Sequence, residues 1–284
     1  MAPNIRASAD WYRRYLRDFA TSAVAGRKHH LTFDEVSTYV MFVGHARSGS
    51  TLVGSLLNAH PDAVLAHELD ALRYVKTGLG RNQLYQLIIE SDRRFTAERA
   101  SLTKQNYSFG VPGMWQGRHR HLRVVGDKHA GTATRELRAR PELLDKLNEV
   151  TGVPIRLVHV VRNPWDNIAT IARRSERSPE VATATYFRRC ETIQKLKATA
   201  DGNRLSLQSV HHEALIGDAT TTLAGVCAFV GLDPQADYLA ACASIVNESA
   251  NASRHSATWP AGLVDHIAHQ AKDYDFLADY SFDR

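Results

Sequence analysis

A loop of small residues around a single cation has the composition of an oxyanion-binding site. It spans residues 44–51 and reads GHARSGST, close to the nucleotide P-loop pattern of glycine, four residues, glycine, lysine and a hydroxyl residue. Small residues let several backbone N–H groups point at one oxyanion, and a helix starting at the loop adds the positive end of its dipole. The hydroxyl groups of Ser48, Ser50 and Thr51 are further donors. We therefore expect this loop to bind a phosphate group, in preference to being only a turn between a strand and a helix.

The loop departs from the P-loop pattern at its lysine. Ser50 stands at that position, and the cation appears three residues earlier as Arg47. Without the lysine, a P-loop enzyme lacks its main means of stabilising charge on a transferred phosphoryl group. A nucleotide-dependent kinase or NTPase is therefore the second hypothesis for this chain and not the first.

A second candidate anion site lies downstream. Arg162 follows the apolar run of residues 155–161, and Thr170 follows Arg162 by eight residues. An arginine binds a phosphate through two parallel hydrogen bonds, and a nearby hydroxyl group adds another. Each residue alone also fits an ordinary role, as a charge at a strand end or as a helix hydroxyl bonded to its own backbone. Together with the first loop, the pair predicts a ligand that carries phosphate groups at two ends.

These motifs resemble those of the sulfotransferases that use 3′-phosphoadenosine-5′-phosphosulfate (PAPS). Residues 47–52, RSGSTL, are similar to the family's 5′-phosphosulfate-binding loop, in which Lys or Arg precedes Ser-Gly-Thr/Ser-Thr. The continuation LLNAHPD at residues 56–62 is similar to the tyrosylprotein-sulfotransferase-like branch. Arg162 and Thr170 resemble the 3′-phosphate motif, an arginine followed eight residues later by a serine, and threonine keeps the hydroxyl group. The resemblance implies PAPS as donor and 3′,5′-ADP (PAP) as product.

The resemblance also implies catalytic roles. Sulfuryl transfer is an in-line displacement at sulfur, which needs a base for the acceptor hydroxyl and cations for the leaving group. Glu68 stands where this branch carries its catalytic glutamate, and a partly dry cleft would raise its pKa; Asp70 is the neighbouring alternative. The sequence GDKH at residues 126–129 is similar to the family's substrate-side lysine motif. Lys128 would then neutralise the sulfuryl oxygens, and His129 is the rival base.

A third cation closes the donor site in the cytosolic members of the family, which supply it from a C-terminal motif that this chain lacks. Arg254, shortly before Trp259-Pro260, is the substitute that the resemblance suggests, and an exposed loop arginine is the alternative. The expected donor-binding residues are therefore Arg47, Ser48, Gly49, Ser50, Thr51, Arg162, Thr170 and Arg254.

The composition sets broader limits. The net charge of +5 and the pI of about 9.1 suit a cleft for a polyanionic small molecule, and they leave a phosphate- or nucleic-acid-binding module as a third hypothesis. The three cysteines form no metal-type pair, and the histidines show no ligand spacing, so we expect no metal. A transferring sulfuryl group carries less negative charge than a phosphoryl group and does not require a divalent cation.

Short apolar runs alternate with helical segments, which predicts an α/β fold with a parallel central sheet between two helical layers, entered by a P-loop-type strand, loop and helix. The expected strands cover residues 38–43, 122–125, 155–161 and 205–210. The expected helices cover residues 51–59, 132–138, 141–150, 165–174, 180–200 and 219–230. Ligands of such sheets bind beyond the carboxyl ends of the strands, where all the motifs stand.

We expect one sulfotransferase domain at residues 37–284, preceded by an N-terminal helical extension at residues 1–36 with a helix near residues 8–26. No apolar signal region opens the chain and its apolar runs are only strand-length, so we expect no membrane insertion and a cytoplasmic location. The expected partner is an acceptor with a hydroxyl group, whether a small molecule, glycan, lipid or peptide, and not a nucleic acid. The aromatic extension would suit a homodimer contact. Acceptor specificity is expected from residues 73–116 and from the helix after Arg174.

Overall fold

A computed structural model describes residues 5–101, 109–200 and 202–283. Five parallel strands form one sheet in the order β2-β3-β1-β4-β5. The strands are β1 (Thr38–Gly44), β2 (Ala63–His67), β3 (Val124–Lys128), β4 (Ile155–Val161) and β5 (Leu205–His211). Every residue of β1 is buried, and β1 reads as an almost continuous apolar run. That pattern is typical of a strand covered on both faces by helices.

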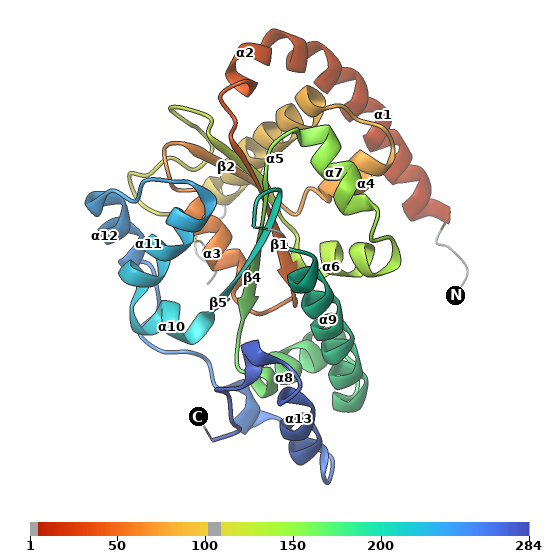
Figure 1. Cartoon of the computed structure of the whole chain (residues 1–284), viewed down its shortest axis with the longest axis vertical. Coiled ribbons are helices and arrows are strands. Elements are labelled where there is room, and N and C mark those ends of the chain that lie inside the picture. The colour runs from red at the N-terminus through yellow and green to blue at the C-terminus, as the bar shows by residue number, and fades with distance from the viewer. Residues whose placement is uncertain (1–4, 102–108, 201, 284) are drawn as a thin grey trace.

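The sheet separates two hydrophobic cores. Side chains of β1 alternate between them, so that Tyr39 and Met41 enter one core while Val40 and Phe42 enter the other. The first core is covered by α4 (Ala71–Lys76), α5 (Arg81–Ser101), α6 (Ala130–Ala139), α7 (Leu143–Thr151), α8 (Pro164–Ser175), α9 (Pro179–Thr199) and α13 (Leu263–Ala271). The second core is covered by α3 (Ser50–Leu57), α10 (His212–Gly217), α11 (Ala219–Val230) and α12 (Ala236–Ala243). The molecule is a three-layer α/β sandwich (Figure 1).

Helix α1 (Ile5–Lys28) packs on the outside of these layers, whereas Phe33 of the short α2 (His30–Phe33) belongs to the first core. Helix α1 runs along α5, and α2 leads into β1. The Tyr15 hydroxyl donates to the Thr77 carbonyl at 3.1 Å, and the Tyr74 hydroxyl donates to Asp18 Oδ2 at 2.6 Å. These two hydrogen bonds attach α1 to the end of α4.

Local sequence signals set the helix ends near the carboxyl edge of the sheet. Helix α8 begins after Asn163, whose side chain accepts hydrogen bonds from the Trp165 and Asp166 amides at 3.1 and 3.3 Å, and Pro164 occupies the first turn. Two short 3₁₀ turns, η1 (Ser253–Ser256) and η2 (Asp275–Leu277), complete the C-terminal part.

The predicted α/β architecture is confirmed, with differences at the elements. Strand β4 has the predicted bounds, β1 and β5 each extend one residue further, and β3 begins two residues later than expected. Strand β2 and helices α4, α5, α10, α12 and α13 were not predicted from the sequence. Strand β2 is only five residues long and follows Pro61-Asp62, so its strand pattern is weak. Within the described ranges we find no helix with the length and apolarity to cross a bilayer.

Candidate active site

All five strands run parallel, so their carboxyl ends meet at one edge of the sheet. The residue segments that leave this edge are the loop after β1, Glu68 after β2, His129 after β3, Arg162 after β4 and His212 after β5. Because the fold brings these segments together, residues spread over more than 160 positions of the chain can act at one site.

The loop after β1 has the backbone of an anion-binding turn. Arg47 has φ of 67° and Gly49 has φ of 98°, and α3 begins at the next residue. A side chain at Gly49 would place a Cβ 2.5 Å from Nδ1 of His212, so the loop requires glycine there both for φ and for space. Among the described residues, no side chain caps the start of α3. Its first N–H groups therefore remain available to an anion, next to the exposed Arg47 side chain.

Arg162 donates a hydrogen bond to the backbone of this loop. The residue is 8% exposed, its Nη1 donates to the Arg47 carbonyl at 3.3 Å, and its Nη2 donates to the Asn251 carbonyl. The Thr170 hydroxyl donates to Ser253 Oγ at 3.1 Å, and Ser253 Oγ donates to Asn251 Oδ1 at 3.3 Å. Arg162 and Thr170 thus both contact the short segment 251–253, and their binding of a phosphate group remains a prediction.

Arg254 lies beside that segment, but its guanidinium group is already engaged. Nη1 is 2.6 Å from Asp166 Oδ2, and the Arg254 amide donates to the other carboxylate oxygen at 2.7 Å. Both side chains are almost fully buried. The geometry is that of a buried ion pair that fixes η1 against α8, and a role for Arg254 at a phosphate remains a prediction.

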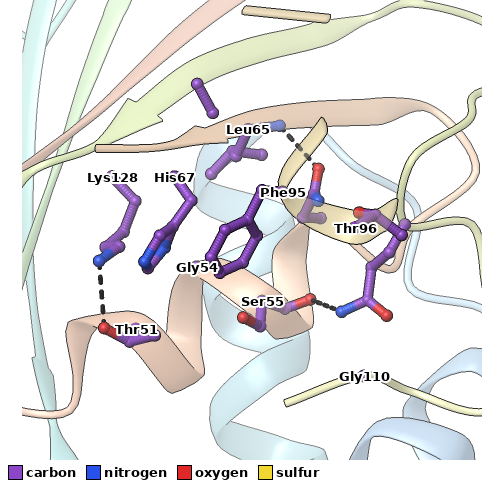
Figure 2. A pocket seen from close by; sticks show the side chains of 12 residues that line it. Thr51, Gly54, Ser55, Leu65, His67, Phe95, Thr96, Gly110 and Lys128 are labelled. Atoms are coloured by element: carbon purple, nitrogen blue, oxygen red, sulfur yellow. Dashed lines mark hydrogen bonds between the residues drawn. The ribbon is translucent and has the colours of Figure 1, made fainter. Parts of the chain in front are cut away.

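Glu68 and Lys128 form the second cluster of the edge. The register pairs His67 of β2 with Lys128 of β3, which places Glu68 directly beside the lysine. Lys128 Nζ lies 3.0 Å from Glu68 Oε1 and donates to Thr51 Oγ1 at 3.1 Å (Figure 2 draws the second contact). The lysine side chain is 4% exposed, whereas that of Glu68 is 51% exposed. The ammonium group therefore links the first turn of α3 to a solvent-accessible carboxylate.

The electrostatics of this pair correct one expectation. Burial raises the pKa of Glu68, but the charge and the hydrogen bond of Lys128, together with the charges of His129 and His67, lower it by more, so the pKa lies below its ordinary value. The expected raised pKa is therefore wrong, because a cation stands at hydrogen-bonding distance. Burial lowers the pKa of Lys128, and the attraction of Glu68 offsets only part of that effect.

A buried aspartate that sequence reasoning missed positions Glu68. Asp127 accepts hydrogen bonds from the Leu69 amide at 3.0 Å and from the Ala71 amide at 2.8 Å. These bonds hold the turn in which Glu68 and Asp70 adopt φ of 61° and 66°, conformations that non-glycine residues seldom take. The available signal was an acidic residue inside an otherwise apolar strand, next to a lysine.

Two histidines complete the edge. His129 precedes the first residue of α6 and lies close enough to Glu68 to lower its pKa, and its Nδ1 atom is buried without a hydrogen-bond partner in the described structure. His212 packs over Gly49, and burial lowers its pKa. Its neighbour Glu213 accepts a hydrogen bond from the Asn163 amide at 2.9 Å, which ties the end of β5 to the start of α8. His212 was not among the predicted site residues.

A pocket of about 200 Å³ adjoins the cluster (Figure 2). It lies between α3, β2 and α5, and Thr51 and Lys128 belong to its wall. In Figure 2 the side chains of His67 and Phe95 stand between Lys128 on one side and Thr96 on the other. A molecule in this pocket would therefore lie next to the Lys128 ammonium group. Within the described residues no group of three or more His, Cys, Asp or Glu side chains is placed to hold a metal ion.

Comparison with known proteins identifies similar folds. The model of the "Sulfotransferase family" matches residues 40–237. Among solved structures, the sulfotransferase domain of the Synechococcus PCC 7002 olefin synthase is 18% identical, with a TM-score of 0.53 over 84% of this chain and 94% of that one. The sulfotransferase domain of the curacin biosynthetic pathway is 16% identical, with a TM-score of 0.55 over 84% of this chain and 99% of that one. No curated protein matches the sequence significantly.

Proposed function

The chain belongs to the sulfotransferase family, and from this premise we propose that PAPS is its donor and that Glu68, Lys128 and Arg47 carry the transfer. Family membership sets aside the kinase, NTPase and binding-module hypotheses. The observation that carries the proposal is the position of Lys128 Nζ, within hydrogen-bonding distance of both Thr51 in the phosphate loop and Glu68. One cation then lies between the donor side and the acceptor side of the site.

The donor would be held at its two phosphate ends. Residues 47–51 and the uncapped start of α3 suit the 5′-phosphosulfate end, because they combine backbone N–H groups, hydroxyl groups and a cation. Arg162 and Thr170 suit the 3′-phosphate, because both side chains lie at segment 251–253. When bound, PAPS supplies an activated sulfuryl group.

Glu68 would act as the general base. Lys128 keeps its carboxylate ionised, and half of the side chain faces solvent, so an acceptor hydroxyl can reach it. The acceptor oxygen forms a new S–O bond while the S–O bond to the 5′-phosphate breaks, and Glu68 takes the hydroxyl proton. The leaving PAP carries the electron pair of the broken bond.

Cations and amides would stabilise the charge that develops during transfer. Lys128 is placed to pair with the sulfuryl oxygens, and Arg47 with the start of α3 is placed to pair with the departing phosphate. Pairing of Lys128 with the sulfuryl group would weaken its hold on Glu68. The carboxylate would then become a stronger base when the donor is present.

A nucleotide panel tests the donor. Thermal unfolding would be followed with PAP, with AMP, and with ATP and Mg²⁺, each at the same concentration. A ligand at 100 times its dissociation constant adds about 2.7 kcal/mol to the free energy of unfolding. We expect PAP to stabilise the protein strongly and the other two weakly. A larger effect of ATP with Mg²⁺ would contradict PAPS as the donor.

A further inference from the structure

The acceptor can be narrowed from the pocket beside Lys128. We propose that it is a small, largely apolar ring compound with one reactive hydroxyl group, a phenol or a cyclic alcohol, bound between α3, β2 and α5. This inference rests on the proposed function, since the pocket wall contains Lys128, which is assigned there to the transfer.

The position of the pocket connects it to the chemistry. Its wall contains Thr51 and Lys128, the two residues joined by a 3.1 Å hydrogen bond, and Lys128 also contacts Glu68. The lysine stem packs on Gly54, where an added Cβ would lie 2.7 Å from Lys128 Cγ. A hydroxyl group at this end of the pocket is therefore adjacent to the Lys128 ammonium group, which lies 3.0 Å from the proposed base Glu68. A hydroxyl at the opposite end, near Thr96, is not (Figure 2).

The size of the pocket limits the acceptor. A cavity of about 150 Å³ holds a benzene ring, and sites for drug-sized ligands measure about 300–1,000 Å³. A volume of about 200 Å³ thus accommodates one substituted ring. It does not enclose a disaccharide.

The two amide side chains of the wall, those of Gln116 and Asn58, are engaged with the protein. Gln116 accepts from the Val111 amide at 2.9 Å and donates to the Ser55 and Phe109 carbonyls at 3.0 and 2.9 Å. Asn58 accepts from the Leu65 amide at 2.7 Å and donates to Asp92 at 2.6 Å. A sugar in this pocket would leave several hydroxyl groups without partners, which is unfavourable. An apolar ring has no such requirement.

An aromatic surface complements such a ring. His67 and Phe95 are stacked with centroids 3.9 Å apart and an interplanar angle of 21°, and Leu65 and Ala66 extend the apolar wall. Aromatic and aliphatic surfaces of this kind bind flat apolar molecules by burial and ring packing. Phe95 comes from α5, within the 73–116 region from which acceptor specificity was expected.

An acceptor panel tests the inference on the full-length protein. With PAPS as donor, kcat/KM would be measured for 4-methylphenol, 2-naphthol, N-acetylglucosamine, a tyrosine-containing peptide and 1-octanol, by chromatography of the sulfated product and of PAP. We expect 4-methylphenol to exceed the sugar, the peptide and the open-chain alcohol by about tenfold or more. Preference for any of those three overturns the inference.

Variants of the wall provide a second readout. Phe95→Ala enlarges the pocket and should raise the kcat/KM ratio of 2-naphthol to 4-methylphenol about tenfold. Thr96→Leu narrows the pocket and should lower the same ratio. This second variant keeps the inference testable if Phe95→Ala does not fold. The matched control is Phe19→Ala, which removes a phenylalanine that is 41% exposed on α1 and should leave the ratio unchanged. An unchanged ratio in both wall variants overturns the inference.

Calorimetry of PAP binding on the same preparations distinguishes a failure of the ring-acceptor inference from a failure of the proposed function. A protein that binds PAP but sulfates only the sugar, the peptide or 1-octanol, or none of the panel, contradicts the ring acceptor and leaves the donor assignment intact. A protein that does not bind PAP contradicts the proposed function itself.

Discussion

Lys128 Nζ lies 3.0 Å from Glu68 Oε1, although 60 residues separate the two positions. The contact joins the ends of two neighbouring strands, β2 and β3, and it forms because the register pairs His67 with Lys128. The pairing of two parallel strands therefore brings together an acid and a cation that are far apart in the sequence. It places them at the carboxyl edge of the sheet, where ligands of such folds bind.

Replacing the proposed base should separate binding from turnover. Glu68→Gln keeps the size of the side chain but removes its ability to accept a proton, so we expect kcat to fall about 10²- to 10⁴-fold. Affinity for PAP, measured by calorimetry, should change little because Glu68 does not belong to either phosphate site. Asp70→Asn is the matched control at the neighbouring carboxylate, with a small effect expected. Normal turnover of Glu68→Gln together with inactive His129→Ala would transfer the role of base to His129.

The pH dependence should report the Lys128–Glu68 pair. The pKa of Glu68 is lowered, so the carboxylate is ionised at neutral pH, and kcat/KM should decline only as pH falls through that lowered value. In Lys128→Met the burial effect that raises the pKa remains, while the largest effect that lowers it is gone. The pKa of Glu68 should therefore move upward. Carboxyl ¹³C NMR of Lys128→Met, with Glu68→Gln for assignment, measures this shift directly, and an unchanged or lower pKa would refute the pairing.

The buried pair of Arg254 and Asp166 should dominate the effect of Arg254→Met. Removing one partner of a buried ion pair leaves an uncompensated charge and costs about 3–5 kcal/mol of unfolding free energy. The matched control is Lys197→Met, which breaks an exposed pair with Asp275 and should cost about 0–1 kcal/mol. Urea unfolding compares the two variants. If Arg254→Met unfolds like the wild type but loses affinity for PAP, Arg254 contacts the donor and is not chiefly structural.

Much of the fold follows from local sequence signals. Strands β1 and β4 are mostly apolar runs rich in β-branched residues, and α8 and α11 begin with a capping side chain, so their positions are predictable to within about a turn. Strand β2 is short and lacks that signal. Its identity as a strand depends on pairing with β3, about 60 residues later, which is tertiary information.

The residues of the candidate site also fall into those with a local sequence signal and those that depend on tertiary structure. The loop around Arg47 and the pair of Arg162 with Thr170 can be proposed from the sequence because each is a local pattern of residue types at a fixed spacing, and their binding of phosphate groups stays a prediction. Asp127 was missed because it accepts two backbone hydrogen bonds from a segment 56–58 residues away. No local sequence pattern predicts such a contact. The lowered pKa of Glu68 was missed for a related reason, since it depends on a neighbour that only the folded sheet supplies.

The central claim is that one ligand with phosphate groups at its two ends is bound by the loop at Arg47 and by the pair at Arg162 and Thr170. Calorimetry of PAP and of 5′-AMP, which lacks the 3′-phosphate, tests it most directly on the wild type, Thr170→Val and Arg162→Lys. We expect the wild type to bind PAP at least about tenfold more tightly than 5′-AMP, and both variants to lose most of this preference. Thr170→Val should also retain its affinity for 5′-AMP, because the Thr170 hydroxyl donates to Ser253 and not to the loop at Arg47. Equal affinity of the wild type for the two nucleotides, or an undiminished preference in both variants, would contradict the central claim.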